Sequence, residues 1–138
     1  MRFLLLALVL SSFAFAKSFT DEDLNYLMKV LPGGIVYVWS PHMPYSMKGI
    51  RIIQAVGDRL RLPVFLLVDP HANRTLALDA QRIFQLGDKD MRPVGSWTLI
   101  QRNITTQFPS VVVFKNGNLR GGTIPGVKSE EHYLKLIE

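Results

Sequence analysis

The chain has 138 residues, of which 16 are lysine or arginine and 11 are aspartate or glutamate, and it contains no cysteine. The absence of cysteine excludes structural disulfides, thiolate nucleophiles and thiol-ligated zinc sites. The basic residues are scattered and do not form a run, so the net charge of +5 is only a weak indication of nucleic-acid binding, and we expect no nucleic-acid partner.

The first sixteen residues have the pattern of a secretory signal peptide. Arg2 supplies a positive charge, Phe3 to Leu10 is an unbroken apolar run, and Ala14-Phe15-Ala16 is a small-residue cleavage site. The apolar run is shorter than the roughly 20 residues that span a bilayer, which argues against a membrane anchor. We therefore expect cleavage of residues 1–16 and a single exported domain over residues 17–138. This domain would have no membrane span and would be periplasmic in a Gram-negative host and secreted otherwise.

The first half of this domain is predicted to alternate helices with buried strands. Apolar residues at positions 24, 27, 28 and 31 share one face of a helix, which Pro32-Gly33-Gly34 ends. Residues 35–39 and 63–68 are apolar runs typical of buried strands. Between them, residues 45–60 have a helical pattern, and Pro44 suits the first helical position. The strand–helix–strand order predicts a crossover between parallel strands.

The second half is predicted to end in a hairpin and a helix. Asn116-Gly117 between two apolar runs is the strongest short hairpin signal, and Ser129 opens the last helix, with Tyr133, Leu134 and Ile137 on its apolar side. The expected elements are a helix over 72–86, a polar loop over 87–95, a short helix from Ser96 to about Arg102, strands over 111–114 and 119–124, and a turn over 115–118.

In this order the elements resemble the thioredoxin superfamily over nearly all of residues 34–138. Phe108-Pro109 before a strand and the Asn-Gly hairpin is similar to the cis-proline strand of that family, and Pro125-Gly126 lies where the family has a glycine before its last helix. The resemblance implies an α/β fold with a mixed, thioredoxin-like sheet of about four to five strands flanked by helices. It also implies a cis peptide bond between Phe108 and Pro109.

The turn after the first strand resembles the active-site turn of exported thioredoxin-like reductases, in which a strand and a tryptophan lead into Cys-x-x-Cys. In one alignment Met43 takes the nucleophilic position and Ser46 the resolving position; in another these are Ser40 and Met43. We prefer the first because it keeps the strand at full length and places Pro44 at the helix start. Neither a thioether nor a hydroxyl can form a mixed disulfide, so we expect no thiol–disulfide catalysis and no cofactor.

The same turn predicts a binding surface. In the superfamily it faces the cis-proline loop across a groove that takes an extended peptide backbone. Aromatic and proline side chains at a rim expected to be exposed favour a peptide or protein partner, and hence a non-catalytic, exported binding or assembly module of the cell envelope. The residues that would line the groove are Trp39, Pro41, His42, Met43, Pro44, Tyr45, Ser46, Phe108 and Pro109.

Two other chemistries fit some of these residues. His42, Met43 and Met47 have the soft ligands that suit Cu(I), and Met43 and Met47 share one side of a helix. The structural alternative is that Met47 packs in the core and His42 is a solvated loop residue. Ser46, His42 and Asp69 have the composition of a hydrolase triad, but no G-x-S-x-G motif surrounds any serine, which argues against that chemistry.

Export predicts a defined mature N-terminus. We expect the protein recovered outside the cytoplasm to begin at Lys17, because signal peptidases cleave after small-residue sites such as Ala14-Phe15-Ala16. N-terminal sequencing of the exported protein measures this directly. Recovery of an exported form that still begins at Met1 would contradict the prediction.

Overall fold

The structure is a computed structural model that describes residues 24–91 and 109–138. The predicted signal peptide, the short helix expected from Ser96 and the peptide bond between Phe108 and Pro109 lie outside these residues.

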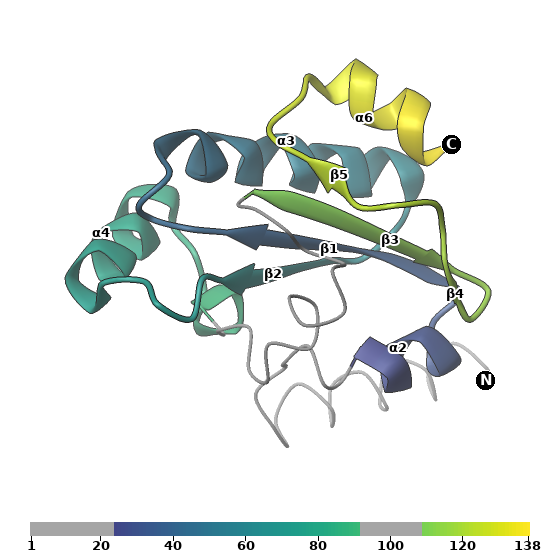
Figure 1. Ribbon diagram of the computed structural model, residues 1–138, viewed down its shortest axis with the longest axis horizontal. Coiled ribbons are helices and arrows are strands. Elements are labelled where there is room, and N and C mark those ends of the chain that lie inside the picture. The colour runs from purple at the N-terminus through teal and green to yellow at the C-terminus, as the bar shows by residue number, and fades with distance from the viewer. Residues whose placement is uncertain (1–23, 92–108) are drawn as a thin grey trace.

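A five-stranded mixed sheet forms the centre of the fold (Figure 1). β1 (Gly33–Trp39) lies between β2 (Val64–Val68), to which it is parallel, and β3 (Ser110–Lys115), to which it is antiparallel. The short strands β4 (Asn118–Leu119) and β5 (Ile124–Pro125) both pair with β3. Every residue of β1 is buried, which explains its continuous apolar sequence. The predicted α/β fold with a mixed sheet of four to five strands is confirmed.

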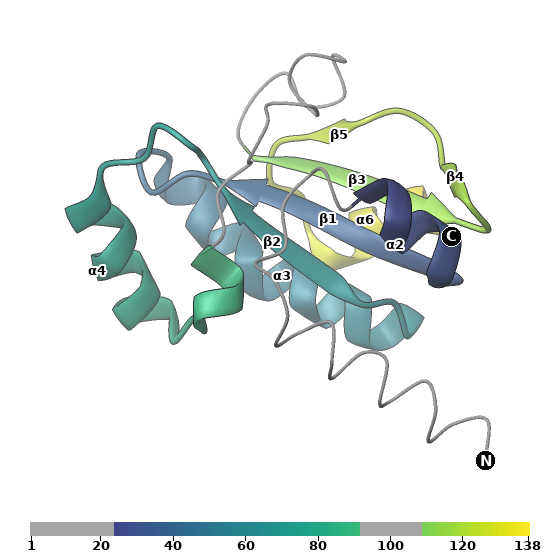
Figure 2. The ribbon, with the colours of Figure 1, turned by 90° about the horizontal axis from the view of Figure 1, so that it is seen from below.

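Helices cover both faces of the sheet. Figures 1 and 2 show α3 (Pro44–Leu60) and α6 (Glu130–Ile137) on one face and α2 (Leu24–Val30) on the other, while α4 (Arg74–Phe84) lies beyond one end of the sheet. Successive side chains of β1 point to opposite faces of the sheet and therefore pack in two different cores. Ile35, Tyr37 and Trp39 pack in the core under α3 and α6. Val36 and Val38 pack in the core beside α2. A short 3₁₀ helix, Asp88–Met91, replaces part of the loop expected over 87–95. Within the described ranges, no helix combines the length and the apolar character needed to cross a bilayer.

Several helix ends and turns form as the sequence predicted. Pro44 opens α3, and the Ser129 side chain accepts a hydrogen bond from the His132 N–H at 3.2 Å and caps α6. Asn116 and Gly117 have φ angles of 51° and 84°, the left-handed pair of a type I′ hairpin turn.

The first strand begins earlier than predicted, because Gly33 and Gly34 belong to β1 and do not lie between the elements. A Cβ atom on Gly34 would overlap the ring of Phe114, and one on Gly33 would lie 2.9 Å from the Leu62 side chain. The two glycines therefore extend the sheet because only a residue without a side chain fits against β3 and the loop before β2.

The prediction of one continuous return strand over 119–124 is wrong for the middle of that range. Phe114 pairs with Leu119 and Val111 pairs with Ile124, so residues 112–113 of β3 face residues 120–123 of the returning chain. The extra length forms a bulge that separates β4 from β5, and Gly121 within it has a φ of 67°.

The packing of α3 on β1 predicts the effect of a single methyl group. A Cβ on Gly49 would meet the Tyr37 hydroxyl, and Val127 lies 3.3 Å away on another side. We expect Gly49→Ala to lower the free energy of unfolding by about 1–3 kcal/mol, since overpacking outweighs the gain in helix propensity. Gly122→Ala is the matched control, because nothing lies within 4 Å of its Cβ position; it should change stability by less than about 1 kcal/mol. Urea denaturation compares the two, and equal stability would contradict this account.

Candidate functional site

The carboxyl ends of β1 and β2 lie side by side, with Trp39 paired to Val68, and two loops leave this edge together. The first, residues 40–43, leads into α3, and the second, residues 69–73, leads into α4, at the left of Figure 1. Open α/β sheets place their ligands at this edge, which makes the two loops the first candidate for a functional site.

The buried hydroxyl of Ser46 closes the first loop. Its oxygen lies 2.6 Å from the carbonyl oxygen of Ser40 and 2.7 Å from that of Met43, and it accepts the Ser40 N–H at 3.0 Å. Ser46 has no exposed surface. Because its proton is directed to backbone carbonyls and no imidazole accepts it, the hydroxyl has no general base, and this geometry argues against the hydrolase triad.

A second set of hydrogen bonds joins the two loops. The Ser40 hydroxyl donates to Asp69 Oδ2 at 2.9 Å, and Asp69 Oδ1 accepts the His71 N–H at 2.9 Å. Across the same gap, the Asn73 N–H donates to His42 Nε2 at 3.0 Å. The Asn73 side chain also accepts from the N–H groups of Thr75 and Leu76 and so caps α4. The start of α4 is therefore fixed to the turn that precedes α3.

Below the turn, Tyr37 supports the first turn of α3. Its hydroxyl donates to the Ser46 carbonyl oxygen at 2.6 Å. Burial raises the pKa of Tyr37 far above its usual value, and the neighbouring Tyr133 raises it further, so the group remains a hydrogen-bond donor at neutral pH. The sequence pattern indicated only a strand residue at Tyr37. The sequence feature that could have indicated this contact is Gly49 in the facing helix, because a glycine there leaves room for the Tyr37 hydroxyl.

The residues predicted to line a groove divide into exposed and buried groups. Met43 is 49% exposed and Tyr45 is 72% exposed. Their neighbours His42 and Pro44 are also exposed. The side chains of Trp39, Pro41, Ser46 and Pro109 are buried, and Phe108 lies outside the described residues. The accessible part of the predicted surface is thus residues 42–45, supported from below by buried members of the same set.

The three residues considered for copper have separate contacts. His42 Nε2 accepts the Asn73 N–H, Met47 packs against the core, and Met43 is the half-exposed N-cap of α3. No cluster of three or more histidine or carboxylate side chains suited to a metal ion occurs in residues 24–91 and 109–138. A copper ion would have to use His42 Nδ1 or displace the hydrogen bond to Asn73, so this arrangement favours the structural alternative for His42 and Met47.

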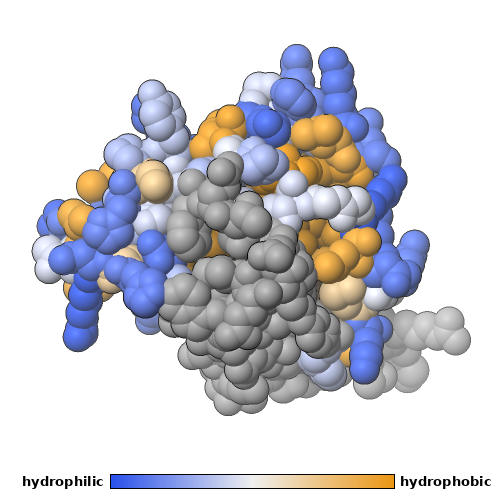
Figure 3. All heavy atoms as spheres, in the orientation of Figure 1, coloured by the Kyte–Doolittle hydropathy of each residue, from blue (hydrophilic) through white to orange (hydrophobic). Residues whose placement is uncertain are grey.

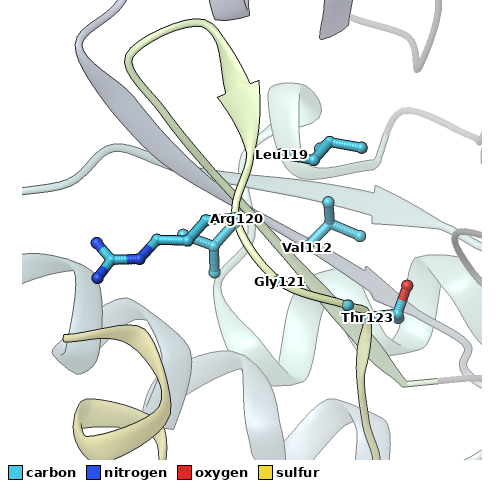
Figure 4. A pocket seen from close by; sticks show the side chains of 7 residues that line it. Val112, Leu119, Arg120, Gly121 and Thr123 are labelled. Atoms are coloured by element: carbon cyan, nitrogen blue, oxygen red, sulfur yellow. The ribbon is translucent and has the colours of Figure 1, made fainter.

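A second surface feature lies along the side of the sheet formed by β4 and β5, the side away from β2. The bulge between β4 and β5 leaves shallow hollows on its two sides, of about 160 and 260 Å³. Figure 4 shows the smaller, lined by Val112, Leu119 and Arg120 among others, and Figure 3 shows exposed apolar side chains around α6 and β4. Sequence reasoning missed these hollows because it treated residues 119–124 as one strand; the Gly121-Gly122 pair was the signal of a bulge.

Comparison with known proteins identifies the architecture. No protein-family model and no curated protein matches the sequence. Among solved structures, a thiol:disulfide interchange protein of the thioredoxin family from Chlorobium tepidum TLS has a TM-score of 0.60 at 14% identity, over 83% of this chain and 81% of its own. MTB DsbF, solved in mixed oxidized and reduced forms, has a TM-score of 0.57 at 12% identity, over 75% of this chain and 76% of its own. StoA from Bacillus subtilis has a TM-score of 0.54 at 16% identity, over 75% of this chain and 80% of its own.

At these identities the likeness concerns the fold. The sheet order, the helices on both faces and the turn at the end of β1 agree with the resemblance found in the sequence. The protein has a thioredoxin-like fold, and its sequence lacks the cysteines of the Cys-x-x-Cys motif.

Proposed function

We propose that this protein is a non-catalytic, exported binding module that uses the turn between β1 and α3 to hold a peptide or protein partner. The observation that carries the proposal is the contrast within this turn: Met43 and Tyr45 expose large side chains to solvent, while Ser46 and Pro41 are buried and fix the backbone beneath them. Export is part of the proposal and rests on the pattern of residues 1–16.

The residues at the helix start support the absence of redox chemistry. A reactive thiolate is stabilised at the beginning of a helix, and in this chain Met43 is the N-cap of α3, with Ser46 buried less than one turn further. This exposed-then-buried pair favours the alignment in which Met43 and Ser46 replace the two cysteines. With no cysteine in all 138 residues, there is no group to carry thiol–disulfide exchange.

The physical properties of the turn suit binding. Tyr45 presents a mostly exposed aromatic ring, a side chain that contributes a large contact area with little loss of conformational entropy. The hydrogen bonds of Ser46 and Ser40 hold the backbone in place before a partner arrives, which reduces the entropic cost of association.

A cysteine replacement tests the alignment. We expect the purified protein to show no insulin-reduction activity above the buffer blank. The double variant Met43→Cys and Ser46→Cys should form a disulfide, detected by mass spectrometry before and after reduction, and gain measurable exchange activity. The pair Ser40→Cys and Met43→Cys is the matched control for the other alignment and should gain less activity. Activity in the unmodified protein would contradict the non-catalytic assignment, and closure of the control pair alone would overturn the alignment.

Site-specific crosslinking tests the binding function. We expect a photo-crosslinking residue at Tyr45, in cells that export the protein, to form a discrete adduct with a partner. The same residue at His132, an exposed position on α6, should not form it. Met43→Ala should weaken the Tyr45 adduct, because both side chains are exposed at the start of α3, two residues apart, and are proposed to contact the same partner. The same adduct from both positions, or one insensitive to Met43→Ala, would argue against this binding surface.

A further inference from the structure

We infer that the partner held at this turn is an acidic peptide segment, in which an apolar or aromatic residue is flanked by carboxylates. The inference rests on the proposed binding function and adds the chemistry of the partner, which follows from the charges around the exposed surface.

Two exposed cationic residues belong to the segments that meet at this turn. Lys48 lies over the Tyr45 ring, with its Nζ 5.4 Å from the ring centroid. Arg74 is the first residue of α4 and directly follows Asn73, whose N–H binds His42. Both are exposed, and within residues 24–91 and 109–138 neither takes part in a salt bridge. Arg59 and Arg82, in contrast, are paired with Glu130 and Asp79.

The carboxylates near the turn already have partners. Asp69 is the acidic residue of the loop itself, and its two oxygens accept hydrogen bonds from the Ser40 hydroxyl and the His71 N–H. Asp79 lies further along α4 and pairs with Arg82. The described rim of the surface thus combines an aromatic ring and a thioether with cations from α3 and α4, which is complementary to a negatively charged apolar segment.

The two kinds of group have different roles in this recognition. Tyr45 and Met43 supply contact area and therefore most of the affinity for any apolar segment. Lys48 and Arg74 are solvent-exposed, so each contributes discrimination of only about two- to fivefold between charged and neutral peptides. At an ionic strength of 0.1 M, salt screens interactions between exposed charges that are more than about 10 Å apart. The difference in affinity between charged and neutral peptides should therefore become smaller as the ionic strength rises.

The test uses three labelled peptides and the purified mature protein. The acidic probe is Glu-Asp-Leu-Phe-Asp-Glu with blocked ends, and its counterparts carry glutamine or lysine at every carboxylate position. Fluorescence anisotropy at low salt should show the acidic peptide binding at least about twofold tighter than the glutamine peptide, and the lysine peptide binding most weakly. Added salt should bring the three affinities together.

Variants separate the charge from the contact area. Lys48→Gln and Arg74→Gln should each reduce the preference for the acidic over the glutamine peptide, and Tyr45→Ala should weaken all binding. Lys135→Gln, which removes one exposed charge from α6, is the matched control and should leave the preference unchanged. Circular dichroism of each variant verifies that the fold is intact.

The outcomes distinguish the two levels of the proposal. Equal affinities for the acidic and glutamine peptides, with binding lost in Tyr45→Ala, would overturn the acidic specificity and leave the binding function standing. Binding of no peptide, or binding insensitive to Tyr45→Ala, would overturn both. A preference that falls equally in Lys135→Gln reports only the net charge of the protein and would also overturn the inference.

Discussion

The buried hydroxyl of Ser46 joins the end of β1 to the start of α3, and the exposed surface of the turn depends on it. Its oxygen contacts the carbonyls of Ser40 and Met43 and the N–H of Ser40, while Tyr37 below holds the Ser46 carbonyl. These bonds restrain the backbone between β1 and α3 without a covalent link. Hydrogen bonds of this kind are neither formed nor broken by a redox reaction, so this restraint on the turn does not depend on whether its surroundings are oxidising or reducing.

The other loop of the candidate surface is held in place by hydrogen bonds to this turn. The Ser40 hydroxyl reaches Asp69, and the Asn73 N–H reaches His42, so the loops after β1 and β2 act as one unit. That coupling places the first residue of α4 beside a surface otherwise built from α3. The fold alone does not determine what binds there, because superfolds host unrelated functions. The proposed specificity therefore derives from the exposed aromatic ring and from two exposed cations, Lys48 and Arg74, that form no salt bridge within the described residues.

Local patterns in the sequence predicted most of the fold. The apolar runs around Val36 and Leu66, the helical period between them and the Asn116-Gly117 turn are signals carried by neighbouring residues, and each corresponds to an observed element. The features that were missed depend on residues far apart in the chain. Gly34 belongs to a strand because of Phe114, and the return strand divides because of its pairing with β3. The position of the turn between the first strand and the next helix could be predicted from residues 39–46, but the burial of Pro41 and the partners of Ser46 required the tertiary structure.

The division of the return strand has a consequence for the behaviour of the protein in concentrated solution. An outer strand with a long, regular row of free backbone groups is a template for pairing with another molecule. Beside β3, the edge of this sheet consists of two short strands, and the bulge with Gly121 between them interrupts the row. A second chain that docked there would find only short stretches with which to pair. The interruption thus protects this edge from pairing with another molecule, a useful property for a chain that has no disulfide to limit its unfolding.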